Sequence, residues 1–159
     1  MAKSPGKDDI VAQYLSRLTA LCDRGFALAI HIRYTRPTLL YQTYSRDWAD
    51  HYSEKGYMLS DPVVHWGLSH TGIVQWNTLT DQDPEGVMAA AVSFGLTNGW
   101  TYATGPASTR TIAGLTRSGG PFPPEDVAEI IQIVDAIHEV TEGFDAFTPE
   151  LQNALRSLI

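Results

Sequence analysis

Phe26-Ala-Leu-Ala-Ile-His-Ile-Arg-Tyr34 and, after Pro37, Thr38-Leu-Leu-Tyr-Gln-Thr-Tyr44 decide the fold of this chain. Both stretches are rich in apolar, aromatic and β-branched residues, and turn residues bound them at Gly25 and Pro37. Two strands joined as a hairpin are therefore expected directly after residue 25.

Helical and further strand patterns lie outside this hairpin. Apolar residues spaced three and four apart, together with capping residues, predict helices over about 8–24, 46–55, 61–69, 84–96 and 124–141. Strand patterns follow at 72–76, 99–104 and 110–116. This order predicts an α+β fold, an α/β/α sandwich of the general PAS or GAF shape. About five antiparallel strands carry helices on both faces.

Composition narrows the class of protein. A chain of 159 residues suits one domain, and 43% apolar with 18% charged residues is ordinary for a globular protein. The formal net charge is -7 and the basic residues are scattered, so these residues themselves are not expected to bind DNA. No apolar run reaches the roughly 20 residues of a membrane span, and the start lacks a secretory signal. A cytoplasmic protein is expected.

The domain limits follow from the same patterns. Residues 1–7 are expected to form a disordered leader, 8–141 the main domain and 142–147 a linker. Thr148-Pro149 is a capped helix start, and Leu151, Leu155 and Leu158 recur at helical spacing. Residues 148–159 are therefore either the start of a truncated helix-turn-helix domain or a helix that docks on the main domain.

Catalytic and metal-binding patterns are weak. Cys22 is the only cysteine and falls on the apolar face of the first helix, where core packing is expected. His65 and His70 are five residues apart and have no cysteine partner, so no metal site is predicted. Nucleophile-elbow and phosphate-loop motifs are absent from the sequence. The chain is expected not to be an enzyme, although an esterase or lactonase using Ser69 or Ser93 remains an alternative.

One cluster of residue types suits recognition of a small molecule. Tyr44, Trp48 and Tyr52 follow one another at intervals of four, and Asp61 and Trp76 come later in the chain. Indole donates one hydrogen bond, phenol donates or accepts, and an ionised carboxylate only accepts. This set matches a ligand with two carbonyl groups, one amide N–H and an apolar body, as in an acyl homoserine lactone.

The spacing of these residues resembles a known family. Tyr44-x3-Trp48-x3-Tyr52-x8-Asp61-Pro62, then Trp76, then Phe94-Gly-Leu-x2-Gly99, is similar to the autoinducer-binding domain of LuxR-type quorum-sensing transcription factors. The resemblance covers roughly residues 8 to 141. It implies an α/β/α sandwich that binds acyl homoserine lactones between sheet and helices and forms a homodimer. DNA would be bound only by a C-terminal helix-turn-helix domain that these residues do not include.

The resemblance also implies residue roles. Trp48 would donate to the lactone carbonyl, Asp61 would accept the ligand amide N–H, and Tyr44 would reach the acyl carbonyl. Tyr52 would line the pocket and Trp76 would pack on the lactone ring. Thr116 is a candidate for a further polar contact. No cofactor other than this ligand is expected.

Two alternatives stay open at this stage. Asp61 before Pro62 is also an ordinary helix cap, and a surface cap would stay wet whereas a ligand acceptor would be buried. Trp48 and Tyr52 could equally be core residues of a PAS/GAF-like dimerisation module that binds no ligand or a different one. Burial of Asp61 and an unfilled cavity are the observations that separate these interpretations.

Overall fold

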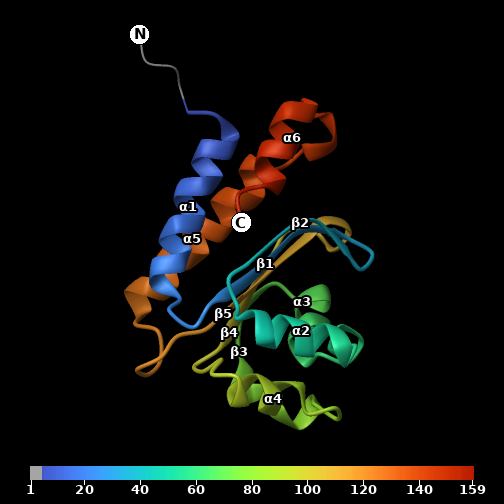
Figure 1. Cartoon of the computed structure of the whole chain (residues 1–159), viewed down its shortest axis with the longest axis vertical. Helices are drawn as coiled ribbons and strands as arrows, with labels where there is room; N and C mark the ends of the chain where they lie inside the picture. The colour runs from blue at the N-terminus through green and yellow to red at the C-terminus, as the bar shows by residue number, and fades with distance from the viewer. Residues whose placement is uncertain (1–4) are drawn as a thin grey trace.

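The chain forms three layers, with one sheet between two groups of helices (Figure 1). This computed structural model describes residues 5–159. Most of the predicted leader, residues 1–4, lies outside the described residues, and the first helix already begins at Lys7. Among the described residues, no helix is long and apolar enough to cross a membrane.

The sheet has five strands in the order β2-β1-β5-β4-β3, and every neighbouring pair is antiparallel. This confirms the predicted α+β fold. The bounds are β1 (Phe26–Arg33), β2 (Arg36–Gln42), β3 (Gly72–Gln75), β4 (Trp100–Thr104) and β5 (Arg110–Leu115). Pro37 lies inside β2 and not in the turn before it, because an edge strand tolerates a residue without an N–H.

One face of the sheet is covered by α1 (Lys7–Leu21), α5 (Pro124–Val140) and α6 (Pro149–Arg156), as Figure 1 shows. We call this the core face. Large side chains fill it, including Leu18, Phe26, Leu28, Leu115 and Val134, all fully buried. Cys22 is part of this core as expected, and burial raises the pKa of its thiol to about 12.

The tail belongs to the same layer. Helix α6 packs against α1 and β2, and Leu155 is fully buried. The Tyr41 hydroxyl donates to the Leu155 carbonyl over 2.7 Å. Within the described residues, α6 therefore packs on the core face of the domain.

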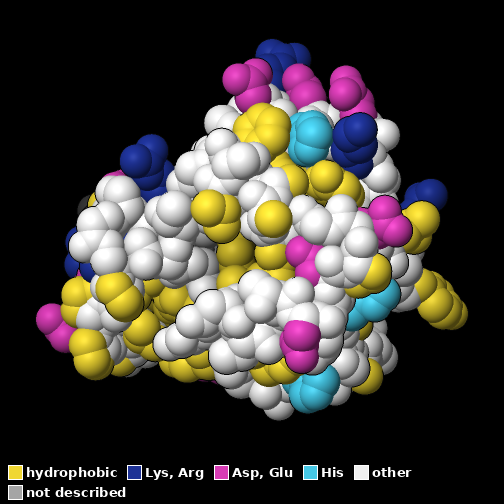
Figure 2. Space-filling view, turned by 90° about the horizontal axis from the view of Figure 1, so that it is seen from below, with side chains coloured by type: hydrophobic (Ala, Val, Ile, Leu, Met, Phe, Trp, Pro, Cys, Tyr) yellow, Lys and Arg dark blue, Asp and Glu magenta, His cyan; other side chains and the backbone are white. Residues whose placement is uncertain are grey.

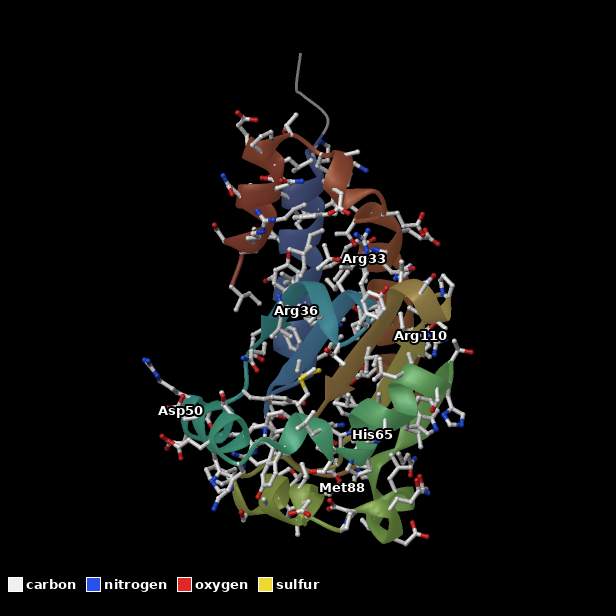
Figure 3. All side chains as sticks on the ribbon, turned by 90° about the vertical axis from the view of Figure 1, so that its right-hand side faces the viewer. Arg33, Arg36, Asp50, His65, Met88 and Arg110 are labelled. Atoms are coloured by element: carbon white, nitrogen blue, oxygen red, sulfur yellow. The ribbon has the colours of Figure 1, made fainter. Side chains whose placement is uncertain are left out.

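The opposite face carries α2 (Arg46–Glu54), α3 (Pro62–Ser69) and α4 (Val87–Ser93). Figure 3 shows this group through the labelled residues Asp50, His65 and Met88, one from each helix. Short 3-10 turns connect the elements at Tyr57–Leu59, Trp76–Thr78, Thr80–Gln82, Ala107–Thr109 and Phe144–Ala146. We call this side of the sheet the cavity face.

Helix boundaries on this face follow from their caps. Ser45 caps α2 as predicted, accepting from the Trp48 backbone N–H at 3.2 Å. Helix α4 starts at Val87, three residues later than the predicted Pro84. Both oxygens of Asp83 accept backbone N–H groups of Val87 and Met88, each at 2.8 Å, and hold the start of the helix there.

Candidate functional site

A cavity of about 610 Å³ lies between the cavity face of the sheet and the helices α2 and α3, with α4 closing one side. Five of the six predicted site residues line it: Tyr44, Trp48, Tyr52, Asp61 and Trp76. Seen from below, the surface of this side of the molecule is hollowed, and apolar side chains gather around the hollow (Figure 2). Tertiary folding thus brings together residues that lie up to thirty-two positions apart in sequence.

Asp61 is both a helix cap and a buried cavity residue. Its Oδ1 accepts the Val63 backbone N–H at 2.9 Å, which caps α3. Its Oδ2 accepts the Tyr52 hydroxyl at 2.8 Å, and only 9% of the residue is exposed. The two interpretations of Asp61 were therefore not exclusive. Each carboxylate oxygen has two lone pairs, so the group retains capacity to accept another hydrogen bond.

The environment of this pair favours the protonated forms. Burial raises the pKa of Asp61 above its ordinary value of 3.8, while the hydrogen bonds from Tyr52 and Val63 oppose the rise. Burial and the neighbouring Asp61 also raise the pKa of Tyr52. The Tyr52 hydroxyl therefore stays a donor to Asp61 at neutral pH and restrains the orientation of the carboxylate.

Trp48 provides a donor without a protein partner. It is 5% exposed and packs among Tyr52, Tyr57 and Phe94, with ring centroids 5.4 to 6.1 Å apart. Within residues 5–159, the Trp48 side chain takes part in none of the hydrogen bonds; its backbone N–H donates to Ser45. An indole N–H beside an unfilled cavity is suited to a ligand carbonyl.

His51 is half-buried and joins this aromatic cluster. Its ring lies 5.0 Å from that of Phe94 and 5.5 Å from that of Tyr57, and the Tyr57 hydroxyl is 3.3 Å from His51 Nε2. The ring thereby supports the helix position from which Trp48 projects.

Tyr44 and Trp76 meet over one glycine in the sheet. A Cβ at Gly114 would lie 3.2 Å from the Tyr44 hydroxyl and 3.5 Å from the Trp76 ring. The indole N–H of Trp76 donates to Thr101 Oγ1 at 2.9 Å. The Trp76 ring lies so close to Gly99 that a side chain at position 99 would collide with it. Trp76 therefore offers a fixed aromatic face to the cavity, not a hydrogen bond.

Thr116 is not brought together with the other five residues. It is fully buried, and its hydroxyl donates to the Gly25 carbonyl at 2.7 Å. Thr116 lies just beyond β5, whereas Gly114, two positions earlier, lines the cavity. The predicted polar contact, Thr116, is therefore two residues beyond the β5 residue that lines the cavity.

Helix α3 is fastened to the sheet by a buried arginine. Arg110, labelled in Figure 3, donates from Nε to the Gly105 carbonyl at 2.8 Å and from Nη1 to the carbonyls of Gly67 and His70. Gly67 also lies against Ile112, where a Cβ would be 2.6 Å from the Ile112 side chain. These contacts hold the C-terminal end of α3 and so fix the helix that Asp61 begins.

Sequence reasoning missed the residues that give the cavity its space. Ala27 and Ala29 on β1 and Gly114 on β5 line it. Their small side chains alternate with the large core residues Leu28 and Leu115, and this alternation is the signal that would have found them. A second hollow of about 560 Å³ adjoins the first and shares Trp76, Met88 and Leu96 with it.

Ser69 and His70 do contact each other, with Oγ and Nδ1 3.0 Å apart. Both side chains also form hydrogen bonds to the Trp66 carbonyl oxygen, from Ser69 Oγ at 3.3 Å and from His70 Nδ1 at 3.0 Å. Both residues are exposed at the C-terminal end of α3. Asp61 begins that helix and bonds elsewhere, so these three residues form no triad. Within residues 5–159, no group of three His, Cys, Asp or Glu side chains could hold a metal ion.

Comparison with known proteins gives a consistent result. The family model described as "Autoinducer binding domain" matches residues 11–140. No curated protein matches the sequence.

Solved structures share the fold at low sequence identity. CepR2 from Burkholderia cenocepacia, an N-acylhomoserine lactone dependent LuxR family transcription factor, is 18% identical with a TM-score of 0.63. That match covers 89% of this chain and 86% of CepR2. SdiA in complex with octanoyl-rac-glycerol is 19% identical with a TM-score of 0.67, over 92% of this chain and 65% of SdiA. The solution structure of residues 1–171 of Escherichia coli SdiA is 20% identical with a TM-score of 0.57, over 84% and 87%. This chain thus spans about two-thirds of the longer SdiA chain.

Proposed function

Because the chain belongs to the autoinducer-binding domain family of LuxR-type regulators, which are not enzymes, we propose that it binds an N-acyl homoserine lactone in the cavity. The observation that carries this proposal is the combination of an unpaired Trp48 donor with the buried Asp61 acceptor in one unfilled space. A polar head group would meet both, and an apolar chain would occupy the remaining volume.

The proposed contacts assign each head-group atom a partner. The Trp48 N–H donates to the lactone carbonyl, and Asp61 accepts the amide N–H beside its bond to Tyr52. The Tyr44 hydroxyl reaches the acyl carbonyl from its place over Gly114, and the lactone ring packs on the Trp76 face. Tyr52 lines the pocket and orients Asp61.

The alternative is a dimerisation module whose aromatic residues only pack a core. That function needs no internal space, whereas about 610 Å³ remains unfilled beside the aromatic cluster. An empty cavity of this size weakens packing around it, so a ligand that fills it would contribute to the stability of the fold.

The test is ligand-dependent stabilisation of the purified chain by synthetic N-acyl homoserine lactones. A ligand at a hundredfold excess over its dissociation constant should stabilise the fold by about 2.7 kcal/mol. Trp48→Phe and Asp61→Asn should each weaken binding by roughly 1 to 3 kcal/mol, because each leaves a buried ligand group unpaired. Isothermal titration measures the affinities.

Matched controls come from the rest of the molecule. Asp135 accepts the Tyr102 hydroxyl at 2.7 Å and does not line the cavity, so Asp135→Asn repeats the Asp61 change without the ligand contact. Trp66→Phe does the same for Trp48. Unchanged affinity in both cavity variants, or equal losses in the controls, would contradict the head-group assignment. An octanoyl glycerol ester tests whether the cavity accepts a head group like that in the SdiA complex.

We further propose that ligand binding is coupled to homodimerisation and to DNA binding by a helix-turn-helix domain outside these 159 residues. The net charge of -7 disfavours DNA binding by these residues themselves, because phosphate binding requires a concentrated positive surface. Light scattering with and without lactone tests dimerisation; a monomer under both conditions would contradict it.

A further inference from the structure

The floor of the cavity is formed by two rows of residues that run across the sheet, with the small residues Gly114, Ala27 and Ala29 on β5 and β1. Strand register places Gly114 opposite Ala27 and Ala27 opposite Gln42; the next row has Ala29 opposite Leu40. All five residues line the cavity. From β5 across β1 to β2 is two strand spacings, or about 10 Å. We call these two rows the trough.

The trough ends at an open edge of the sheet. β2 is the outermost strand on this side, and no other strand within residues 5–159 covers it. Leu40 on β2 and Met58, in the turn after α2, both line the cavity and are 53% and 43% exposed. Partly exposed apolar side chains at the end of an apolar cavity lose contact with water when an apolar group lies on them.

We propose that the trough holds the acyl chain of the ligand and that the chain leaves the protein between Leu40 and Met58. This inference rests on the proposed function and specifies its ligand class: straight acyl chains of about eight carbons or more, since such a chain spans about 10 Å. Because the edge is open, longer chains are accepted with their ends in solvent.

The second hollow is the other space that an acyl chain could enter. It lies beyond Trp76, which is held by its bond to Thr101 and by its close packing on Gly99. Reaching it from the head-group site would require Trp76 or the buried Met88 and Leu96 to move. The trough needs no such movement, because Ala27, Ala29 and Leu40 line the same cavity as Asp61.

The expected signature is a chain-length profile. Each buried methylene is worth about fourfold in affinity. For N-acyl homoserine lactones, affinity should rise by about that factor per carbon from four carbons to about eight. It should then level off, without rejection of a twelve-carbon chain, because later carbons lie outside the edge.

A matched pair of variants locates the chain. Ala29→Leu fills the middle of the trough, and Ala89→Leu makes the same change in a residue that lines only the second hollow. Ala29→Leu should lower affinity for the ten-carbon lactone at least tenfold and leave that for the four-carbon lactone within about twofold. Ala89→Leu should leave the whole profile unchanged.

A second pair tests the edge and puts no added bulk into the fold. Met58→Ser should lower affinity for the ten-carbon lactone several-fold relative to the four-carbon lactone. Leu59→Ser is the control, because Leu59 is 84% exposed and does not line the cavity. Titration of all variants, after melting curves show that each is folded, gives the comparison.

Three results would overturn the proposal. Equal affinities from four to twelve carbons would exclude burial of the chain in the trough. A length dependence that survives Ala29→Leu and disappears in Ala89→Leu would place the chain in the second hollow. Rejection of the twelve-carbon lactone would show that the edge is closed. If no lactone of any length binds, the proposed function itself fails, which none of the first three results implies.

Discussion

The two faces of the sheet are built from the same strands and differ in side-chain size. On β1, Phe26, Leu28 and Ile30 point to the core face and are fully buried, whereas Ala27 and Ala29 alternate with them on the cavity face. β5 repeats this with Leu115 and Gly114. Large residues interdigitate with α1, α5 and α6, while small ones leave space that helices alone do not fill.

Because of this difference, the core face mainly stabilises the fold, and the cavity face carries the polar groups suited to recognition of a ligand. Core-face residues contribute to folding by removing apolar surface from water. The cavity face instead collects Tyr44, Trp48, Tyr52, Asp61 and Trp76, whose polar atoms need partners that the protein supplies only in part. The cavity face can therefore tolerate changes in apolar size that the core face cannot.

The largest expected effect compares two leucines on neighbouring strands. Leu28→Ala on the core face should lower the free energy of unfolding by about 2 to 5 kcal/mol, because it leaves a void in a close-packed region. Leu40→Ala on the cavity face should cost less than about 1 kcal/mol, since that side chain is already half exposed. Urea unfolding measures both. Similar costs for the two variants would show that the faces are packed alike.

A second comparison uses the pH dependence of stability on the cavity face. Burial raises the folded-state pKa of Asp61 above 3.8, so the folded chain binds this proton more tightly than the unfolded chain. Stability of the ligand-free protein should therefore fall as pH rises from about 3.8 through the folded-state pKa. Asp61→Asn should flatten that part of the curve, measured by urea unfolding at a series of pH values. A slope that persists unchanged in this variant would assign the effect to other groups.

The core face should show the opposite slope. Burial, and then the neighbouring His31, lower the pKa of His138 below 6.5, while Glu142 and Asp135 oppose this. The Thr111 hydroxyl is 2.6 Å from His138 Nδ1, which suits a neutral ring. The unfolded chain thus binds this proton more tightly, and stability should fall as pH drops through 6.5 towards the folded-state pKa.

His138→Gln tests that assignment on the core face. The variant should lose the fall in stability below pH 6.5 while keeping the Asp61-dependent slope, which belongs to the other face. Thermal melts across the same pH series are sufficient. Loss of both slopes in one variant would mean that the two faces do not titrate independently.

Much of the fold could be predicted because local signals agreed with tertiary structure. The Ser45 and Asp61 caps and the strand patterns predicted α2, α3 and all five strands. The predicted helix ends were wrong where the residues that cap the helix lie outside the periodic pattern of apolar residues. Asp83 caps α4 from four residues before Val87, and α1 ends at Leu21 although the helix was predicted to extend to about residue 24.

The candidate site could be predicted only in its polar members. Spacing of aromatic residues around Asp61 selected five residues that line one cavity, because their chemistry is visible in the sequence. The Asp61–Tyr52 bond and the Gly114 floor could not be predicted, since both depend on how α2, α3 and β5 approach one another. Thr116 was chosen for its hydroxyl, but it lies just beyond the end of β5, where its hydroxyl donates to the Gly25 carbonyl.

The smallest expected effect concerns α6, which adds to the core face without a strand of its own. Tyr41→Phe removes the hydroxyl that donates to the Leu155 carbonyl and leaves that carbonyl unpaired in a buried place. A loss of about 1 kcal/mol is expected, confined to docking of the helix. Amide hydrogen exchange over residues 149–156 should accelerate several-fold, with little change in α5.

Tyr102→Phe is the control, because Tyr102 also donates to a core-face acceptor, but that acceptor is Asp135 on α5 and not a group on α6. If exchange accelerates equally in α5 and α6 in the Tyr41 variant, the hydroxyl stabilises the whole core face and not the docked tail. If exchange in α6 is unchanged, the apolar contacts of Leu151, Leu155 and Leu158 hold the helix by themselves. The tail would then be as firmly part of the core face as α1.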